Sequence, residues 1–354
     1  MKLIKYLFIC SLITVLAVSC EKGLDPIIPV SPKPDVSGPT LVIEYPVEGK
    51  TIRSPEEVAT ITIKLVATDD IELKSVNLQM DGTEIVSYTS FKDYRRAFIE
   101  FDYNNMTDGD HTLTVTAIDL TDKSITQTVN FRKITAPVYV PLDGEVLYFP
   151  FEGDYIDLIS GNAATPVGTP GFAAGKLYDA YAGAADAYLT YPSAGIIGDN
   201  LSAAFWYKIN AIPDRAGIFM ISPPTTIVLQ DRTKGLRFAR EADGTKQKFW
   251  FNIGNGTVDS WFVPPSFDVI DDWIFIAFTV SESHVTIYIN GEISVEGDYE
   301  GPINWNDCSS ISLMSGAPNV IYWDHLSDLS LIDELHIFTR VISAAEVQSL
   351  YAIK

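Results

Sequence analysis

The sequence predicts an all-β protein built from two β-sandwiches in series. Residues 40–133 alternate apolar and polar side chains in short runs, as Leu41, Ile43 and Tyr45 do. Residues 142–354 contain longer β-branched and aromatic runs bounded by Gly, Asn and Asp. At about 150 residues a domain, 354 residues suffice for two domains, and a hydrophobic content of 47 % suffices for two cores.

The N-terminus has the pattern of an export signal. A short cationic start precedes an apolar run over residues 6–18, which is too short to span a bilayer core of roughly 30 Å as a helix. The run ends in Leu-Ala-Val-Ser-Cys20, which resembles the lipobox of bacterial lipoproteins, with the relaxed form typical of Bacteroidetes. The resemblance implies that residues 1–19 are removed and that Cys20 is lipidated at an outer membrane, facing the cell exterior. The alternative is a buried cysteine beside an ordinary cleavage site.

Residues 20–39 are expected to form an extended tether. Five prolines and few apolar residues favour polyproline-like backbone and cannot build a core. Of the three cysteines, Cys10 leaves with the signal and Cys20 carries lipid. Cys308 is then alone, so the sequence predicts no structural disulfide.

Residues 40–133 contain about seven short strands with turn signals between them, one of which is Asp81-Gly82. The phrases "ATDD" and "DGDHTLTVTAID" are similar to those of bacterial Ig-like modules. The aspartates in them (Asp69, Asp70, Asp108, Asp110 and Asp119) are interpreted as turn residues rather than as cadherin-style calcium ligands. Residues 134–141 are a stiff, proline-containing linker, and each sandwich is expected to fold by itself.

The second sandwich carries the most specific motifs. Asn290-Gly291 joins two strand-like runs and favours a tight hairpin. A strand at residues 331–338 then precedes Ser343 and Glu346, the capping box of one short helix. Together with "VLYFPFEG" at residues 146–153, this order resembles the laminin-G-like, concanavalin A-like jelly-roll family. The resemblance implies a concanavalin A-like jelly roll over residues 142–354.

Charge and motifs exclude several functions. A net charge of −21 argues against nucleic acid, which needs clustered Lys and Arg. The four histidines are scattered, so no zinc site is expected. Glucanases of the same fold place alternate carboxylates on one strand of a cleft, and Glu152-Gly-Asp-Tyr-Ile-Asp157 is only superficially similar because it falls in the opening turn. We therefore expect no enzymatic activity, with a glycoside hydrolase as the least favoured alternative.

One structural calcium ion is a candidate cofactor. The resemblance implies that the opening turn and the closing strand approach each other, so Asp157, Asn162 and Asp333 are candidate ligands. The alternative is that Asp333 only hydrogen-bonds to backbone.

The tryptophans are the basis of the functional prediction. Trp206 and Trp273 lie on predicted strands and are expected in the core, whereas four others lie in or beside polar loops. Sugars present apolar faces ringed by hydroxyls, so their sites combine an aromatic platform with polar side chains. The candidate carbohydrate-binding residues are Trp261, Trp305, Trp323, Asn255, Asp259, Asn306 and Asp324. The expected partner is extracellular polysaccharide or glycan, and the alternative is an adhesion module that binds surface proteins.

Overall fold

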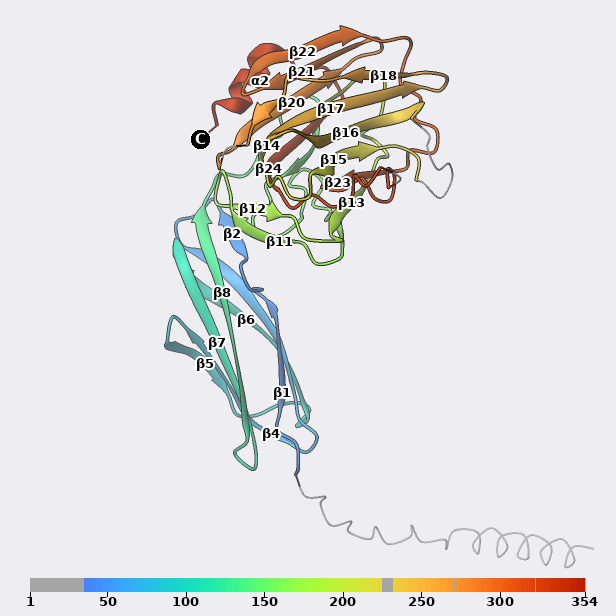
Figure 1. The fold of residues 1–354 in the computed structure, drawn as a ribbon. Helices are drawn as coiled ribbons and strands as arrows, with labels where there is room; N and C mark the ends of the chain where they lie inside the picture. Colours follow the sequence, from blue (N-terminus) through green and yellow to red (C-terminus); the bar gives the residue numbers. More distant parts are fainter. Residues whose placement is uncertain (1–34, 225–231, 270, 322, 354) are drawn as a thin grey trace, which may run out of the picture.

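The computed structural model describes residues 35–224, 232–269, 271–321 and 323–353. Two β-sandwiches follow one another along an elongated molecule, and the predicted all-β class is confirmed (Figure 1). The predicted signal segment, Cys20 and most of the tether lie outside the described residues. Within the described part of the chain, no helix is long and apolar enough to cross a membrane.

The first sandwich packs two sheets face to face. A three-stranded sheet has the order β1-β3-β6 and a five-stranded sheet the order β2-β8-β7-β4-β5. The strands are β1 Thr40–Tyr45, β2 Thr51–Ser54, β3 Ala59–Thr68, β4 Leu73–Met80, β5 Thr83–Tyr88, β6 Arg96–Met106, β7 Gly109–Asp119 and β8 Ser124–Thr135.

The alternation in the sequence produces the core of this sandwich. Ile63, Leu65, Leu78 and Val115 are fully buried between the sheets, because every second residue of a strand faces the same side. The carboxylate of Asp119 accepts hydrogen bonds from the backbone amides of residues 121 and 123. This turn role is the one that the sequence predicts.

The second sandwich packs two larger sheets. One has the order β10-β13-β23-β15-β16-β17-β18, with β19 on β17, and the other β11-β12-β24-β14-β20-β21-β22, with β9 on β24. The strands are β9 Glu145–Phe149, β10 Thr165–Val167, β11 Gly171–Ala174, β12 Asp179–Ala182, β13 Tyr188–Pro192, β14 Leu201–Lys208, β15 Arg215–Ile221, β16 Lys234–Asp243, β17 Lys246–Asn255, β18 Asp259–Phe262, β19 Phe267–Asp268, β20 Ile274–Val280, β21 His284–Ile289, β22 Glu292–Asp298, β23 Ser310–Leu313 and β24 Leu331–Phe338.

The local predictions for this sandwich are confirmed. Asn290 and Gly291 both have positive φ, at 50° and 82°, in the turn between β21 and β22. Helix α2, Ala344–Tyr351, begins after Ser343, which forms a capping box with Glu346. Trp206 is buried between α2 and its sheet, and Trp273 packs against the same cluster.

Ion pairs and close backbone packing join the two sandwiches. Lys50 forms an ion pair with Asp154, and Arg53 Nη1 lies 3.3 Å from Glu152 Oε1. Gly153 packs onto the backbone of residues 49–51, where a Cβ atom would lie 2.6 Å from the carbonyl oxygen of Gly49. The linker is held as well, because the Tyr139 hydroxyl donates to Glu145 at the start of β9.

Candidate functional site

Two tryptophans lie on the outer face of the β16–β18 strands. In β17, Phe249 and Phe251 point into the core, so the alternation turns Trp250 outward. Trp261 on β18 is paired with Asn252 and shares that face with Trp250. The two indole rings lie 5.2 Å apart between centroids.

The segment between β23 and β24 adds a third tryptophan. It crosses the outer face of the sheet, where Val320 packs on Trp250. At its far end the fully buried Asp328 pairs with Arg240 of β16, at 2.9 Å between Oδ1 and Nη2. This anchoring places the ring of Trp323 6.4 Å from that of Trp261. We call Trp250, Trp261 and Trp323 the aromatic patch.

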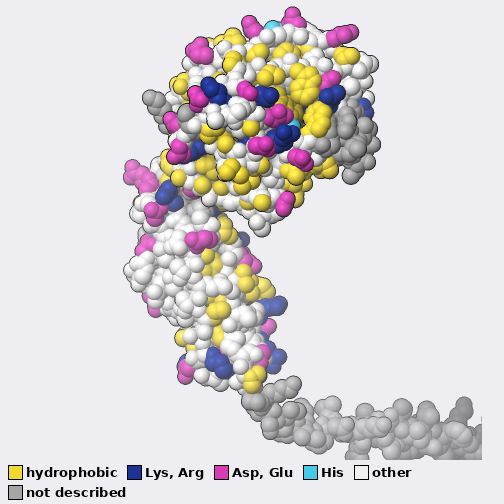
Figure 2. Space-filling model, in the orientation of Figure 1, with side chains coloured by type: hydrophobic (Ala, Val, Ile, Leu, Met, Phe, Trp, Pro, Cys, Tyr) yellow, Lys and Arg dark blue, Asp and Glu magenta, His cyan; other side chains and the backbone are white. Residues whose placement is uncertain are grey.

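The patch is partly open to solvent. Trp250 is buried, Trp323 is half-buried and Trp261 is 41 % exposed. In the space-filling view, hydrophobic, basic and acidic side chains lie side by side on this part of the domain (Figure 2). An exposed indole ringed by polar groups matches the apolar face and hydroxyl rim of a sugar.

Two carboxylates hold the indoles in place. Asp259 Oδ2 accepts hydrogen bonds from Trp261 Nε1 at 2.8 Å and from Asn252 Nδ2 at 3.2 Å. Glu241 Oε1 accepts from Trp250 Nε1 at 3.1 Å and lies 2.9 Å from His325 Nε2. Burial lowers the pKa of His325, so its ring is neutral at pH 7 and donates to Glu241 through Nε2.

Among the described residues, Arg232, Arg215 and Lys248 are cations that border the patch. The guanidinium of Arg232 lies over two of its rings, 5.1 Å from the centroid of Trp323 and 6.0 Å from that of Trp261. Arg215 Nη1 donates to the carbonyl of Trp323 at 3.3 Å. Lys248, on the same face of β17 as Trp250, lies 3.9 Å from Glu241.

A groove of about 690 Å³ begins beside the patch at Arg215. Its walls include Asp186, Asp214, Asp324 and Leu326. The predicted residue Asp324 is exposed and lines this groove next to Trp323. The groove therefore adjoins the aromatic patch on the side of Arg215 and Asp324.

The structure thus brings together Trp261, Trp323, Asp259 and Asp324 of the predicted carbohydrate-binding set. It gives Trp305 a different environment, because that ring packs against the core and its Nε1 donates to the carbonyl of Gly198 at 2.9 Å. Asn306, next to Trp305, is exposed in the same loop. The side-chain oxygen of Asn255 closes its own turn by accepting from the amides of residues 257 and 258.

The candidate calcium ligands are bound to backbone. Asp157 is fully buried, and its carboxylate accepts from the amides of residues 148, 159 and 160. Asp333 accepts from the amides of residues 176, 177 and 334. Asn162 is exposed and gives its backbone carbonyl to the amide of Asp157. The described residues contain no group of three or more His, Cys, Asp or Glu arranged to hold a metal ion, and calcium stays a prediction.

The acidic segment at Glu152 lies at the junction with the first sandwich. Glu152 is 2 % exposed, bridges to Arg53 and accepts from the amide of Asp179. Burial raises its pKa to about 8. Glu152 thus lies between the two domains, where it lines a pocket of about 240 Å³ together with Lys50 and Arg53.

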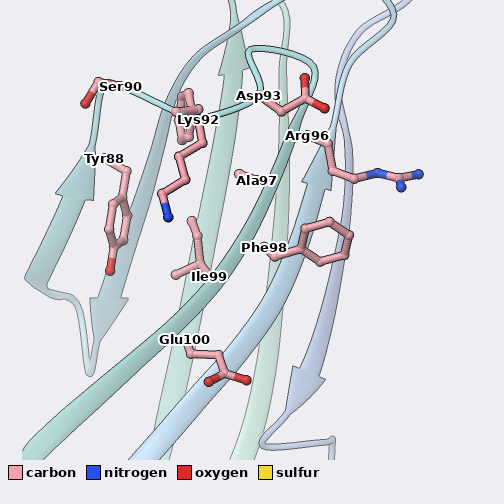
Figure 3. A pocket seen from close by; sticks show the side chains of 10 residues that line it. Tyr88, Ser90, Lys92, Asp93, Arg96, Ala97, Phe98, Ile99 and Glu100 are labelled. Atoms are coloured by element: carbon pink, nitrogen blue, oxygen red, sulfur yellow. The ribbon is translucent and has the colours of Figure 1, made fainter.

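A second hollow lies on the first sandwich, between β5 and β6, with a volume of about 450 Å³. Tyr88 and Ile99 face one another across it, and Lys92 reaches into the space between them (Figure 3). Arg96 and Phe98 also line the hollow, and Phe98 is 71 % exposed.

Several residues around the aromatic patch escape prediction from composition. Arg232, Glu241 and His325 lie in three segments that only the fold brings together. The period-2 alternation of β17 was a usable signal for Trp250, because it places Phe249 and Phe251 on one face and Trp250 on the other.

Comparisons with known proteins identify both sandwiches. Residues 183–348 match the family described as the concanavalin A-like lectin/glucanases superfamily, and residues 39–115 match the bacterial Ig domain. No curated protein matches the sequence.

Among solved structures, domain 4 of AbnA, an extracellular arabinanase from Geobacillus stearothermophilus solved with arabinotriose, is 19 % identical. That alignment covers 58 % of this chain and 98 % of that one, with a TM-score of 0.46. The binding domain of botulinum neurotoxin DC, solved with rat synaptotagmin II, is 14 % identical over 59 % of this chain and 51 % of that one, with a TM-score of 0.43. This chain thus spans about half the length of the toxin domain.

Proposed function

Because the chain carries a bacterial Ig-like domain followed by a concanavalin A-like lectin/glucanase domain, we propose that it is a non-catalytic, cell-surface protein that binds extracellular glycan. The observation that carries this proposal is the aromatic patch, in which three indole rings from separate segments meet beside an open groove. Packing alone does not require Trp261 to remain 41 % exposed. A sugar ring stacked on Trp261 would meet Asp259, Arg232 and Asp324 at its hydroxyl rim.

A glycan array probed with the purified full chain tests the proposal. We expect binding to at least one polysaccharide, and we expect Trp261→Ala with Trp323→Ala to abolish retention on an affinity gel made with that polysaccharide. An array with no positive glycan would contradict the proposed function.

Anchoring is a second part of the proposal. The apolar run that ends at Cys20 supports lipid attachment at the outer membrane. Several acyl chains are needed for stable membrane binding, so Cys20→Ala should release the protein or block its processing. Fractionation of cells that express this variant gives the answer, and a variant that is still processed and membrane-bound would refute lipidation.

The second candidate function is protein adhesion through the Ig-like domain. The specific observation in its favour is the hollow between β5 and β6, with Phe98 exposed beside it. Exposed aromatic side chains beside a groove are typical of protein contacts. In an adhesion assay, Phe98→Ser should then abolish binding to the protein partner on other cells, and on the glycan array it should leave glycan binding unchanged.

A further inference from the structure

Charged groups at the aromatic patch are unevenly satisfied. Glu241 and Asp259 each accept hydrogen bonds from an indole N–H and from a second side chain. Among the described residues, the carboxylates that contact these cations lie at long distances: 3.6 Å from Arg232 to Asp259, 3.7 Å from Arg215 to Asp214 and 3.9 Å from Lys248 to Glu241. These distances exceed those of hydrogen bonds. Among the described residues, Arg232 is therefore a cation of the patch that has no hydrogen-bonded carboxylate.

Arg232 is the most pronounced case. Its side chain is 41 % exposed, and its guanidinium lies over the rings of Trp323 and Trp261. Among the residues that the structure describes, none accepts a hydrogen bond from this guanidinium. The two indoles shield one side of the group from water, which strengthens a charge-assisted hydrogen bond made on the other side.

We infer that the glycan carries a carboxylate, as in a hexuronic acid or a sialic acid, and that Arg232 binds it. This inference rests on the proposed function and names its ligand class. The planar guanidinium fork matches a carboxylate with two parallel hydrogen bonds. Arg215 and Lys248 would contact further acceptors along the chain, and the sugar ring would stack on Trp261.

The overall charge of the chain limits how this recognition works. At a net charge of −21, the long-range field repels an anionic polymer. The aspartates of the neighbouring groove, Asp186, Asp214 and Asp324, act in the same direction. Affinity must therefore come from contact at the patch, so the position of the carboxylate along the glycan should matter more than the total charge of the glycan.

Matched glycans test the inference. The purified full chain is titrated by calorimetry with oligogalacturonate and with its carboxyl-reduced form, and with sialyllactose and lactose. We expect at least a tenfold preference for the acidic member of one pair, and the pair that shows it identifies the source of the carboxylate. Arg232→Gln should remove this preference, whereas Lys208→Gln, which removes a cation on β14 of the opposite sheet, should keep it.

Three outcomes would overturn the inference. If the acidic and reduced forms bind equally and Trp261→Ala abolishes both, the protein is a glycan-binding protein for neutral sugars, and the proposed function survives. If a broad array shows only neutral ligands, the inference is likewise wrong and the proposed function likewise survives. If no glycan binds at all, both the inference and the proposed function are wrong.

Discussion

The domain junction and the aromatic patch both place an arginine beside aromatic rings and carboxylates, but the junction is buried and the patch is partly exposed. At the junction, Arg53 lies 5.9 Å from the ring centroid of Tyr178 and 3.3 Å from the carboxylate of Glu152. At the patch, Arg232 lies over two indole rings, and Asp259, the carboxylate that it contacts among the described residues, is 3.6 Å away. Glu152 is 2 % exposed, while Trp261 is 41 % exposed.

The two regions differ in whether other residues of the chain contact all of their charged and aromatic groups. At the junction, the Ig-like domain brings Lys50 and Arg53 to the carboxylates of the jelly roll, and Gly153 lets the two backbones meet. At the patch, the described residues leave donors and an aromatic face open to solvent. A cluster of aromatic and charged residues therefore has a structural role where other residues of the chain cover it. Where it remains exposed to solvent, it is a candidate binding site.

Substitution of Gly153 should disrupt the contact at the domain junction. Gly153 and Gly161 both have positive φ, but only at Gly153 would a Cβ atom meet backbone, 2.6 Å from the Gly49 oxygen. We expect Gly161→Ala to cost about 1 kcal/mol of stability, and Gly153→Ala about 3 kcal/mol because steric clash adds to strain.

Calorimetry distinguishes the two glycine variants. Gly153→Ala should separate unfolding into two transitions, one for each domain, and expose the linker near residues 134–144 to protease. Equal effects from both substitutions would show that contact at Gly153 does not hold the domains together.

The junction should also respond to pH, with a smaller effect. Burial raises the pKa of Glu152 to about 8, above the value of about 4.3 in an unfolded chain. Its contribution to stability is therefore fully present below about pH 4 and is lost as the pH rises towards 8. We expect the melting temperature to fall by a few degrees more between pH 5 and pH 9 in the natural protein than in Glu152→Gln. The exposed Glu282→Gln is the control, and identical pH profiles for the natural protein and Glu152→Gln would contradict the expectation.

Much of the fold could be predicted from the sequence because its signals are local. Alternation placed the strands, Asn290-Gly291 placed a hairpin, and Ser343 with Glu346 placed the helix start. The site could be predicted only in part. Loop composition indicated Trp261 and Trp323, but could not show that Trp305 turns inward to the carbonyl of Gly198.

The contacts that complete the patch are long-range. Arg232 joins Trp261 and Trp323 only because the segment after β23 folds back across β16 and β17. Glu241 likewise meets His325 from a distant part of the chain. No local pattern encodes these long-range contacts. The sequence therefore indicated Trp261 and Trp323, but not the charged residues around them or the geometry of the site.

A paired comparison of Trp261→Ala and Trp305→Ala tests the central claim most directly. Both tryptophans lie in the jelly roll, but only Trp261 belongs to the open patch. Calorimetric titration with a glycan found on the array, together with thermal melts, should show that Trp261→Ala weakens binding roughly ten- to a hundred-fold with a nearly unchanged melting temperature. Trp305→Ala should instead lower the melting temperature and leave the affinity of the folded protein unchanged. The reverse pattern, with Trp261→Ala unfolding the domain and Trp305→Ala losing the ligand, would contradict the account.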